Sequence, residues 1–224
     1  HVEAFSDPLV ECRKCHQRFR ADEVSGTCPS CGAEGSFTEP RQFNLMFQTH
    51  LGPTEDAGST VYLRPETAQG IYVDAPYIQQ VMRLKLPFGI AQIGKAFRNE
   101  VTPGNFTFRT VEFEQAEMQF FVRPEEADHF FDYWKEERMR WYREALGFPK
   151  DTVRFHPHDK KELAHYAKTA ADIQYEFPIG WQEIEGVHNR GDWDLSRHQE
   201  YSGKDLASFD EEKKEKVLPW IVET

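Results

Sequence analysis

The sequence predicts an α+β fold: an antiparallel β-sheet flanked by helices, with a small metal-binding insertion near the start of the chain. Three observations predict it. Segments with strand character outnumber helical ones, and turn residues separate them as in hairpins. One long segment carries aromatic residues at helical spacing. The four cysteines form two close pairs. We expect the helices to lie on one side of the sheet.

Composition limits the class of protein. The 224 residues allow one substantial domain and a small appendage, and a hydrophobic content of 39% is enough for a packed core. No apolar run approaches the ~18 residues of a membrane helix, and the start of the chain is not a signal peptide. The net charge of −11 argues against a nucleic-acid coat protein, which is usually basic. We expect a cytoplasmic protein with no membrane partner.

The insertion is predicted from the cysteines. The pairs Cys12-x-x-Cys15 and Cys28-x-x-Cys31 are separated by twelve residues, and such pairs wrap four thiolates around one tetrahedral ion. We expect a structural Zn²⁺ within a module of residues 9–36, because the protein fills all four positions and leaves none for a substrate. Two disulfides, a redox pair, or His16 as a ligand are the alternatives. A cytosolic location disfavours disulfides.

The first half of the chain then alternates strands with one helix. Strands are predicted at 43–47, 61–64 and 89–100, where short apolar runs are bounded by turn residues. A helix is predicted at 77–84, because Ile78, Val81, Met82 and Leu84 form an apolar stripe. Pro87 and Gly89 end that segment.

The second half begins with a long strand at 107–122. The clearest helix follows, since Pro124 and two acidic residues suit a helix start and Gly147 suits its end. Its aromatic residues are interpreted as core packing. A further helix is predicted at 161–173, and strands at 180–186 and 217–223.

One strand–turn–strand block has the chemistry of a nucleotide site. Arg98 and Glu100 lie two apart, and Arg109 and Phe113 follow beyond a turn. Two guanidinium groups suit phosphates, a ring can stack on a base, and a carboxylate can accept from its amino group. Each residue also has a structural interpretation, as a cross-strand ion pair or as core.

Strand alternation extends this block. Side chains two apart share a face, so Phe113, Gln115, Glu117 and Gln119 lie on one side of the predicted strand. Phe113 and Glu117 are then about 13 Å apart at ~3.3 Å per residue. That is roughly the length of an adenine ring joined through its α-phosphate to a small group.

The segment Phe97-Arg98-Asn99-Glu100 followed by Arg109-x-x-x-Phe113 resembles motif 2 of the class II aminoacyl-tRNA synthetases. Residues 62–71, 91–100, 112–117 and 186–195 are similar to the homodimeric glycyl type of that family. Among these strings, Arg64-Pro65-Glu66-Thr67-Ala68-Gln69-Gly70 is more specific than motif 2. The resemblance covers nearly the whole chain and implies a class II synthetase-like sheet.

The resemblance implies a role for each site residue. Arg98 would be the catalytic residue and bind the ATP α-phosphate, with Glu100 on the adenine amino group, Phe113 stacked on adenine and Arg109 on the γ-phosphate. The residues implied for the glycine ammonium are Glu66, Glu117 and Glu223. Those implied for the edge of the site are Gln115, Glu183 and Arg190.

The resemblance also implies ATP, Mg²⁺, glycine and tRNA(Gly) as substrates and cofactors, and a homodimer in the full-length form. Residues 1–8 would end an upstream core segment and 37–224 would form the catalytic core. Motif 1, most of motif 3 and an anticodon-binding domain are expected outside the chain, so we expect these 224 residues alone to adenylate glycine poorly. Alternatives are a non-catalytic accessory or nucleic-acid-binding relative, a zinc-ribbon interaction module, and activation of threonine or proline.

Overall fold

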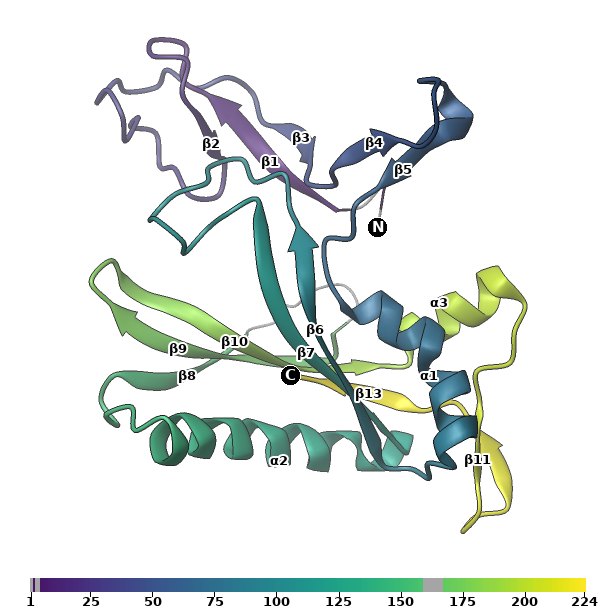
Figure 1. The fold of residues 1–224 in the computed structure, drawn as a ribbon. Helices are drawn as coiled ribbons and strands as arrows, with labels where there is room; N and C mark the ends of the chain where they lie inside the picture. The colour runs from purple at the N-terminus through teal and green to yellow at the C-terminus, as the bar shows by residue number, and fades with distance from the viewer. Residues whose placement is uncertain (1, 3–4, 159–166) are drawn as a thin grey trace. The chain divides into compact units, whose positions relative to one another are not determined.

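The computed structural model describes residues 2, 5–158 and 167–224 (Figure 1). The chain forms two compact units. Unit 1 contains His1–Thr67 and Ile93–Gln115, and unit 2 contains Ala68–Gln92 and Ala116–Thr224. In the described part of the chain, no helix combines the length and the apolar character needed to cross a membrane.

Unit 1 is built from short antiparallel strands. A three-stranded sheet has the order β2-β1-β3, and β4 pairs with β5. The strand predicted at 43–47 is β3, which begins and ends earlier. The elements of unit 1 are β1 (Ser6–Glu11), β2 (Arg18–Arg20), β3 (Arg41–Asn44), β4 (Gln48–His50), the 3₁₀ turn η1 (Ala57–Ser59) and β5 (Thr60–Tyr62).

Unit 2 contains a sheet with the strand order β6-β7-β13-β10-β9-β8 (Figure 1). The pairs β7–β13, β13–β10, β10–β9 and β9–β8 are antiparallel, which confirms the predicted antiparallel sheet. The ends of β6 and β7 continue along the chain into unit 1. The strands are β6 (Phe88–Phe97), β7 (Glu112–Val122), β8 (Val153–Pro157), β9 (Thr169–Phe177), β10 (Gly180–Gly191), β11 (Ser208–Asp210), β12 (Glu215–Val217) and β13 (Trp220–Glu223).

Helices cover both faces of this sheet, so the expectation of helices on one side is wrong. α1 (Ala68–Met82) and α3 (Trp193–Ser202) pack on one face, where Tyr72 and Leu195 join Phe121 and Ile221. α2 (Ala127–Arg140) packs on the other face against Val122 and Val222. Successive strand residues point to opposite faces, so Phe121 and Val122 belong to different cores.

The helix predicted at 77–84 is the second half of α1, and its predicted apolar stripe is wrong. Val81 and Met82 are 58% and 65% exposed, whereas Ala68, Ile71, Tyr72 and Ala75 are buried. Pro76 lies inside the helix. The buried face lies earlier in the sequence and overlaps the end of the motif at residues 64–70, which was not predicted to be helical.

The helix predicted from Pro124 to Gly147 is confirmed. Pro124–Glu126 forms a 3₁₀ turn, η2, before α2, and Trp141–Ala145 forms a π-helical turn, η3, after it. Gly147 has a φ of +72°, the left-handed conformation that ends helices. The predicted core role of the aromatic residues is confirmed for Phe130, Phe131, Trp134 and Tyr142, which pack in the core clusters.

Other predicted boundaries differ from the structure. β6 ends at Phe97, before Arg98, and β7 begins only at Glu112. Residues 161–166 of the predicted helix lie outside the described residues, and the segment from Thr169 is strand β9, not helix. β8 and α3 were not predicted.

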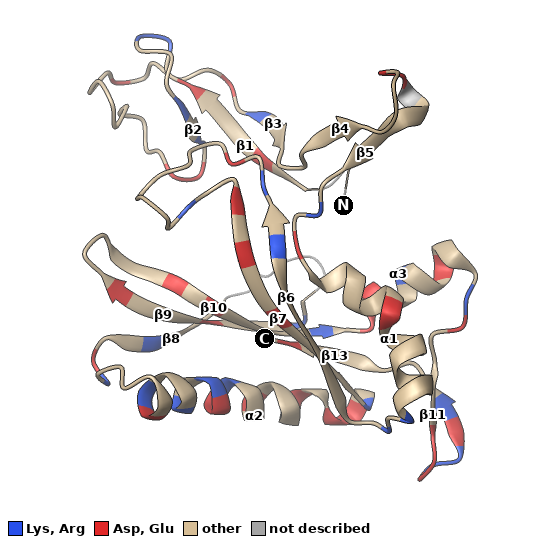
Figure 2. Cartoon of the chain, viewed as in Figure 1, with Lys and Arg blue, Asp and Glu red and all other residues tan. Residues whose placement is uncertain are grey.

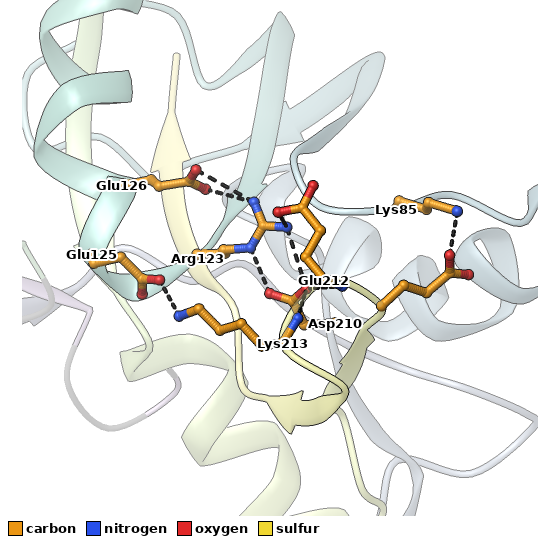
Figure 3. A network of polar contacts seen from close by, with 8 residues as sticks. Lys85, Arg123, Glu125, Glu126, Asp210, Glu212 and Lys213 are labelled. Atoms are coloured by element: carbon orange, nitrogen blue, oxygen red, sulfur yellow. Dashed lines mark hydrogen bonds and ion pairs between the residues drawn. The ribbon is translucent and has the colours of Figure 1, made fainter.

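A buried ion pair fixes the β11–β12 hairpin, which precedes β13. Arg123, at the end of β7, donates from Nε to Asp210 Oδ2 at 2.5 Å and from Nη2 to Oδ1 at 3.3 Å. Asp210 Oδ1 also accepts from the backbone N–H groups of Glu212 and Lys213 in the hairpin turn. Figure 3 shows Glu126, Glu212 and Asp210 around the guanidinium group.

Replacing Asp210 with asparagine should destabilise this hairpin. A buried arginine would lose its charged partner, which strongly destabilises proteins, so we expect the melting temperature of the chain at pH 7 to fall by about 5–10 °C. The hydrogen bond from Arg123 lowers the pKa of Asp210 to about 2 from 3.8. The stabilisation is therefore complete above pH ~4 and is lost as the pH falls toward 2.

Thermal melting between pH 7 and pH 2.5 checks this result, and the gap between wild type and variant should narrow as the pH falls. Glu212→Gln is the matched control, because Glu212 pairs with the same arginine but its side chain is 81% exposed. Exposed pairs contribute little. An Asp210→Asn variant that melts like wild type at pH 7 contradicts the assignment.

Candidate functional site

In unit 1, Arg98 lies between two aromatic rings. It follows the last residue of β6, and its backbone N–H donates to Val111 O at 3.0 Å, which continues the pairing beyond the sheet. Its guanidinium carbon is 5.3 Å from the centroid of the Phe113 ring and 5.6 Å from that of Phe5. Nε donates to Pro65 O at 3.1 Å. These contacts hold the guanidinium group in place while leaving its remaining N–H groups to bind an anion.

Arg109 and Glu100 contact each other in the same unit. Arg109 Nη1 donates to Glu100 Oε2 at 3.3 Å, and their side chains are 38% and 10% exposed. Arg109 and Gly104 exchange backbone hydrogen bonds of 3.0 and 3.1 Å, which closes the turn between the two arginines. Arg109 remains partly exposed and its hydrogen bond to Glu100 is long, at 3.3 Å, so a phosphate group can compete for its guanidinium group.

Gln115 holds the segment that carries Glu66. Its Oε1 accepts from the backbone N–H of Thr67 at 3.1 Å. On the other side of Glu66 in the sequence, Arg64 Nε donates to Lys95 O at 2.7 Å. Glu66 is half-buried between these two anchors. Of the predicted site residues, unit 1 therefore contains Arg98, Glu100, Arg109, Phe113, Gln115 and Glu66.

In unit 2, β-sheet register brings a second group of predicted residues together. Gln119 on β7 is directly opposite Glu223 on β13, and Glu223 is directly opposite His188 on β10. Glu117 is two residues from Gln119 and shares its face. Figure 2 shows the acidic residues along β7 in red.

These residues form a buried hydrogen-bond network. Gln119 Nε2 donates to Glu117 Oε1 and to Glu223 Oε2, both at 2.7 Å. Arg190 Nη1 also donates to Glu223 Oε2, at 2.6 Å, and its Nε and Nη2 reach Asp194 at 2.7 and 2.9 Å. We call Glu117, Gln119, Arg190, Asp194 and Glu223 the carboxylate network.

The network contains more acidic than basic groups. Three carboxyl groups, of Glu117, Asp194 and Glu223, lie with the single guanidinium group of Arg190. Burial raises the pKa of Glu223, but the hydrogen bond from His188 and the charge of Arg190 outweigh burial and hold that pKa well below its usual value. Glu223 is therefore ionised at neutral pH. Buried negative charge of this kind favours a bound cation.

Arg190 and Glu183, both predicted for the edge of the site, lie in different environments in the structure. Arg190 is 1% exposed and lies in the centre of the network, while Glu183 is exposed at a bulge in β10. Gln119, Asp194 and His188 were given no role from sequence. Gln119 was already placed on the face of Glu117 by strand alternation, which was the available signal. Asp194 follows Arg190 by four residues, but Arg190 lies in strand β10 and Asp194 in helix α3, so no single periodicity in the sequence signals this pair.

The four cysteines lie together in unit 1, as predicted. Their Sγ atoms are all within 4.8 Å of one another, and the group could hold a metal ion. The residue after each pair, His16 or Gly32, has a positive φ of 58° or 69°. Its N–H donates to the carbonyl of the first cysteine, at 2.8 or 2.9 Å. The two Cys-x-x-Cys segments therefore have matching turns.

The sulfur distances argue against disulfides. Cys12 Sγ is 3.7 Å from Cys31 Sγ, and Cys15 Sγ is 3.6 Å from Cys28 Sγ. Tetrahedral thiolates at ~2.3 Å from an ion are about 3.8 Å apart, whereas a disulfide bond is ~2.05 Å. His16 is not part of the group, since its Nδ1 lies 3.2 Å from Glu11 Oε1. The geometry fits four thiolate ligands.

Comparison with known proteins agrees with this fold. Residues 47–222 match the family described as tRNA synthetase class II core domain (G, H, P, S and T). That match covers more than half of the chain, and the chain belongs to this family.

Within the family, the chain is similar to glycine–tRNA ligases. The enzyme of Treponema denticola is 58% identical over 231 residues, and that of Borreliella burgdorferi is 54% identical over 228. Each alignment covers 100% of this chain and 51% of the relative. The Streptomyces coelicolor enzyme is 49% identical, with 53% of it covered. The chain spans about half the length of these curated relatives.

Proposed function

We propose that this chain is the catalytic core of a glycine–tRNA ligase. In the first step, a carboxylate oxygen of glycine attacks the α-phosphorus of ATP. The bond from that phosphorus to the bridging oxygen breaks, and glycyl-adenylate and pyrophosphate form. In the second step, a ribose hydroxyl at the 3′ end of tRNA(Gly) takes the glycyl group and AMP leaves.

The observation that carries the proposal is the carboxylate network. Glycine has no side chain, so its ammonium group must supply most of the binding. Buried carboxyl groups, among which Glu223 is ionised, suit that group. Similarity to glycine–tRNA ligases over the whole chain supports the same substrate. We assign Glu66, Glu117 and Glu223 to the ammonium, and keep Gln115, Glu183 and Arg190 as candidates for the edge of the site.

We assign ATP to the residues of unit 1. Arg98 would neutralise the α-phosphate as charge develops in the transition state, and Arg109 would exchange Glu100 for the γ-phosphate. Phe113 would stack on adenine, and Glu100 would accept from the adenine amino group. Mg²⁺ would neutralise charge on the phosphates. Activation of a carboxylate needs little proton transfer, so binding and orientation by these residues supply most of the catalysis.

The cysteine group is proposed to hold a structural Zn²⁺. All four ligands would be thiolates, which prefer soft ions, and a filled tetrahedral shell leaves no position for a substrate. Ser36 Oγ lies 3.2 Å from Cys12 Sγ, and this hydrogen bond lowers the pKa of Cys12 to about 6. Cys31 shifts the other way: a backbone hydrogen bond at Ala33 lowers its pKa, but burial and the neighbouring sulfurs raise it to about 12, so binding of an ion would release the Cys31 proton.

A cytoplasmic homodimer is also proposed, in line with the resemblance to the homodimeric glycyl type. Val73, Tyr77 and Val81 support it, because they are 66%, 70% and 58% exposed and form one apolar stripe on α1. Light scattering of the natural polypeptide tests the dimer. Twice the chain mass supports it, and a single chain mass contradicts it.

Glycine-dependent exchange of pyrophosphate into ATP tests the activity. The measurement uses the natural polypeptide, including any segments that the gene encodes outside residues 1–224. Exchange with glycine, and not with alanine, threonine or proline, supports the proposal. No exchange with any amino acid favours a non-catalytic relative.

Replacing Glu117 with glutamine should weaken glycine binding more than ATP binding. The substitution keeps the shape of the side chain and removes one negative charge, so we expect the KM for glycine to rise about 10–100-fold. The KM for ATP should change less than about threefold, since its proposed ligands lie elsewhere in the sequence. Pyrophosphate exchange measures both constants.

Glu114→Gln is the matched control, because this residue is on the opposite, exposed face of β7. It should leave both KM values near wild type. Equal increases for glycine and ATP in the Glu117 variant would remove Glu117 from the glycine site.

A further inference from the structure

The side-chain amide of Gln119 bridges the two carboxylates proposed for glycine. Gln119 is fully buried on β7, and its Nε2 donates at 2.7 Å to both Glu117 and Glu223. A side-chain amide has two N–H hydrogens. Both are therefore used to hold the two carboxyl groups at a fixed separation.

Tyr72 fixes which way this amide points. The Tyr72 hydroxyl, on α1, donates to Gln119 Oε1 at 2.6 Å. Burial raises the pKa of Tyr72 well above its usual value, so the hydroxyl keeps its proton and remains a donor. A flipped amide would turn its oxygen toward the carboxylates and its NH₂ group toward the hydroxyl. The observed orientation is the one that satisfies every donor.

A third contact holds the other oxygen of Glu223. His188 Nδ1 lies 2.6 Å from Glu223 Oε1 and donates to it, since an ionised carboxylate only accepts. Gly186 leaves room for the His188 ring. A Cβ atom at residue 186 would lie 2.7 Å from His188 Cε1 and 2.9 Å from its Nε2, so a side chain there would displace the ring.

We propose that Gln119, oriented by Tyr72, is a positioning residue that holds Glu117 and Glu223 as a fixed pair and so sets the affinity for the substrate ammonium group. The inference rests on the proposed function. Without Gln119 both carboxyl groups lose a 2.7 Å hydrogen bond, and nothing then fixes the spacing that the bridge sets between them. That loss weakens an ammonium site and leaves the proposed ATP ligands unchanged. Tyr72 and Gln119 therefore act on glycine through the carboxylates.

Steady-state pyrophosphate exchange by the natural polypeptide tests the proposal. Tyr72→Phe removes only the hydroxyl that orients the amide, and the KM for glycine should rise about 3–10-fold. Gln119→Leu removes both charge-assisted hydrogen bonds, and the same constant should rise at least about tenfold. The KM for ATP should stay within about twofold in both. Gly186→Ala should also raise the KM for glycine, because it displaces His188.

Tyr175→Phe is the matched control. Tyr175 lies on β9 among Phe148 and Phe177, in a different core cluster. It should leave the KM for glycine unchanged. If the Gln119→Leu chain fails to fold, as judged by its melting curve, Tyr72→Phe decides the outcome alone.

The outcomes separate this inference from the proposed function. If the wild type shows glycine-dependent exchange and Tyr72→Phe raises only the KM for glycine, both the function and the inference are supported. If the wild type is active but a folded Tyr72→Phe chain leaves both KM values unchanged, or raises the KM for glycine and for ATP equally, the inference is overturned and the function stands. An equal rise of the KM for glycine in Tyr175→Phe also overturns the inference. A wild type without glycine-dependent exchange overturns the function itself.

Discussion

Replacing Arg98 with alanine should lower glycine-dependent pyrophosphate exchange by about 10²–10³-fold. The guanidinium group is held over Phe113 and by Pro65 O, so it is already placed before a ligand binds. A preorganised donor that meets developing charge typically contributes a factor of this size. The loss should appear in kcat, because the charge on the α-phosphate grows only as the transition state is reached.

Pyrophosphate exchange and melting curves of the natural polypeptide check this prediction together. Arg41→Ala is the matched control, since Arg41 is an exposed arginine on β3 of the same unit. It should retain wild-type exchange. An Arg98→Ala variant that folds and keeps more than about a tenth of the activity contradicts the proposed role.

Removing the Zn²⁺ that we propose for the cysteine group should unfold the module around it. Structural zinc sites of four thiolates have apparent binding free energies of about 10–16 kcal/mol in small peptides, which is comparable to the stability of a whole domain. The module has short strands and few buried side chains, so its core cannot replace the ion. We expect one zinc per purified chain, and loss of β-sheet signal in far-UV circular dichroism on chelation.

Cys28→Ser should lower the zinc content below half an ion per chain, and elemental analysis measures it. Ser30→Ala is the control, because Ser30 lies between Cys28 and Cys31 but is exposed and is not a ligand. It should retain one ion. A Cys28→Ser chain with full zinc content and an unchanged spectrum would show that the cysteines do not bind a structural ion.

Local patterns predicted the elements whose signal lies within a few residues. The helix from Pro124 to Gly147 has a start signal, an apolar face and a glycine end, and all three appear in the structure. The grouping of the four cysteines was predicted from their spacing, since two Cys-x-x-Cys segments can bring four sulfurs together. The alternation along β7 also correctly placed Glu117 and Gln119 on one face, and both are buried in the structure.

The errors occurred where distant segments decide the environment. α1 contains two apolar stripes, and packing against Phe121 and Leu195 selects the one with Ile71 and Tyr72. Nothing within residues 68–84 reveals that choice. In the same way, β9 was mistaken for helix because its pairing with β8 and β10 is not a local property.

The sequence by itself predicted the type of chemistry: two arginines and a ring for a nucleotide, carboxylates for a cation, and four cysteines for a metal ion. Only the tertiary structure decided how the carboxylates are held. Gln119, Glu223 and His188 come from three strands that are adjacent in the sheet but far apart in the chain. Their hydrogen bonds depend on strand register, and register is set by the packing of the whole sheet.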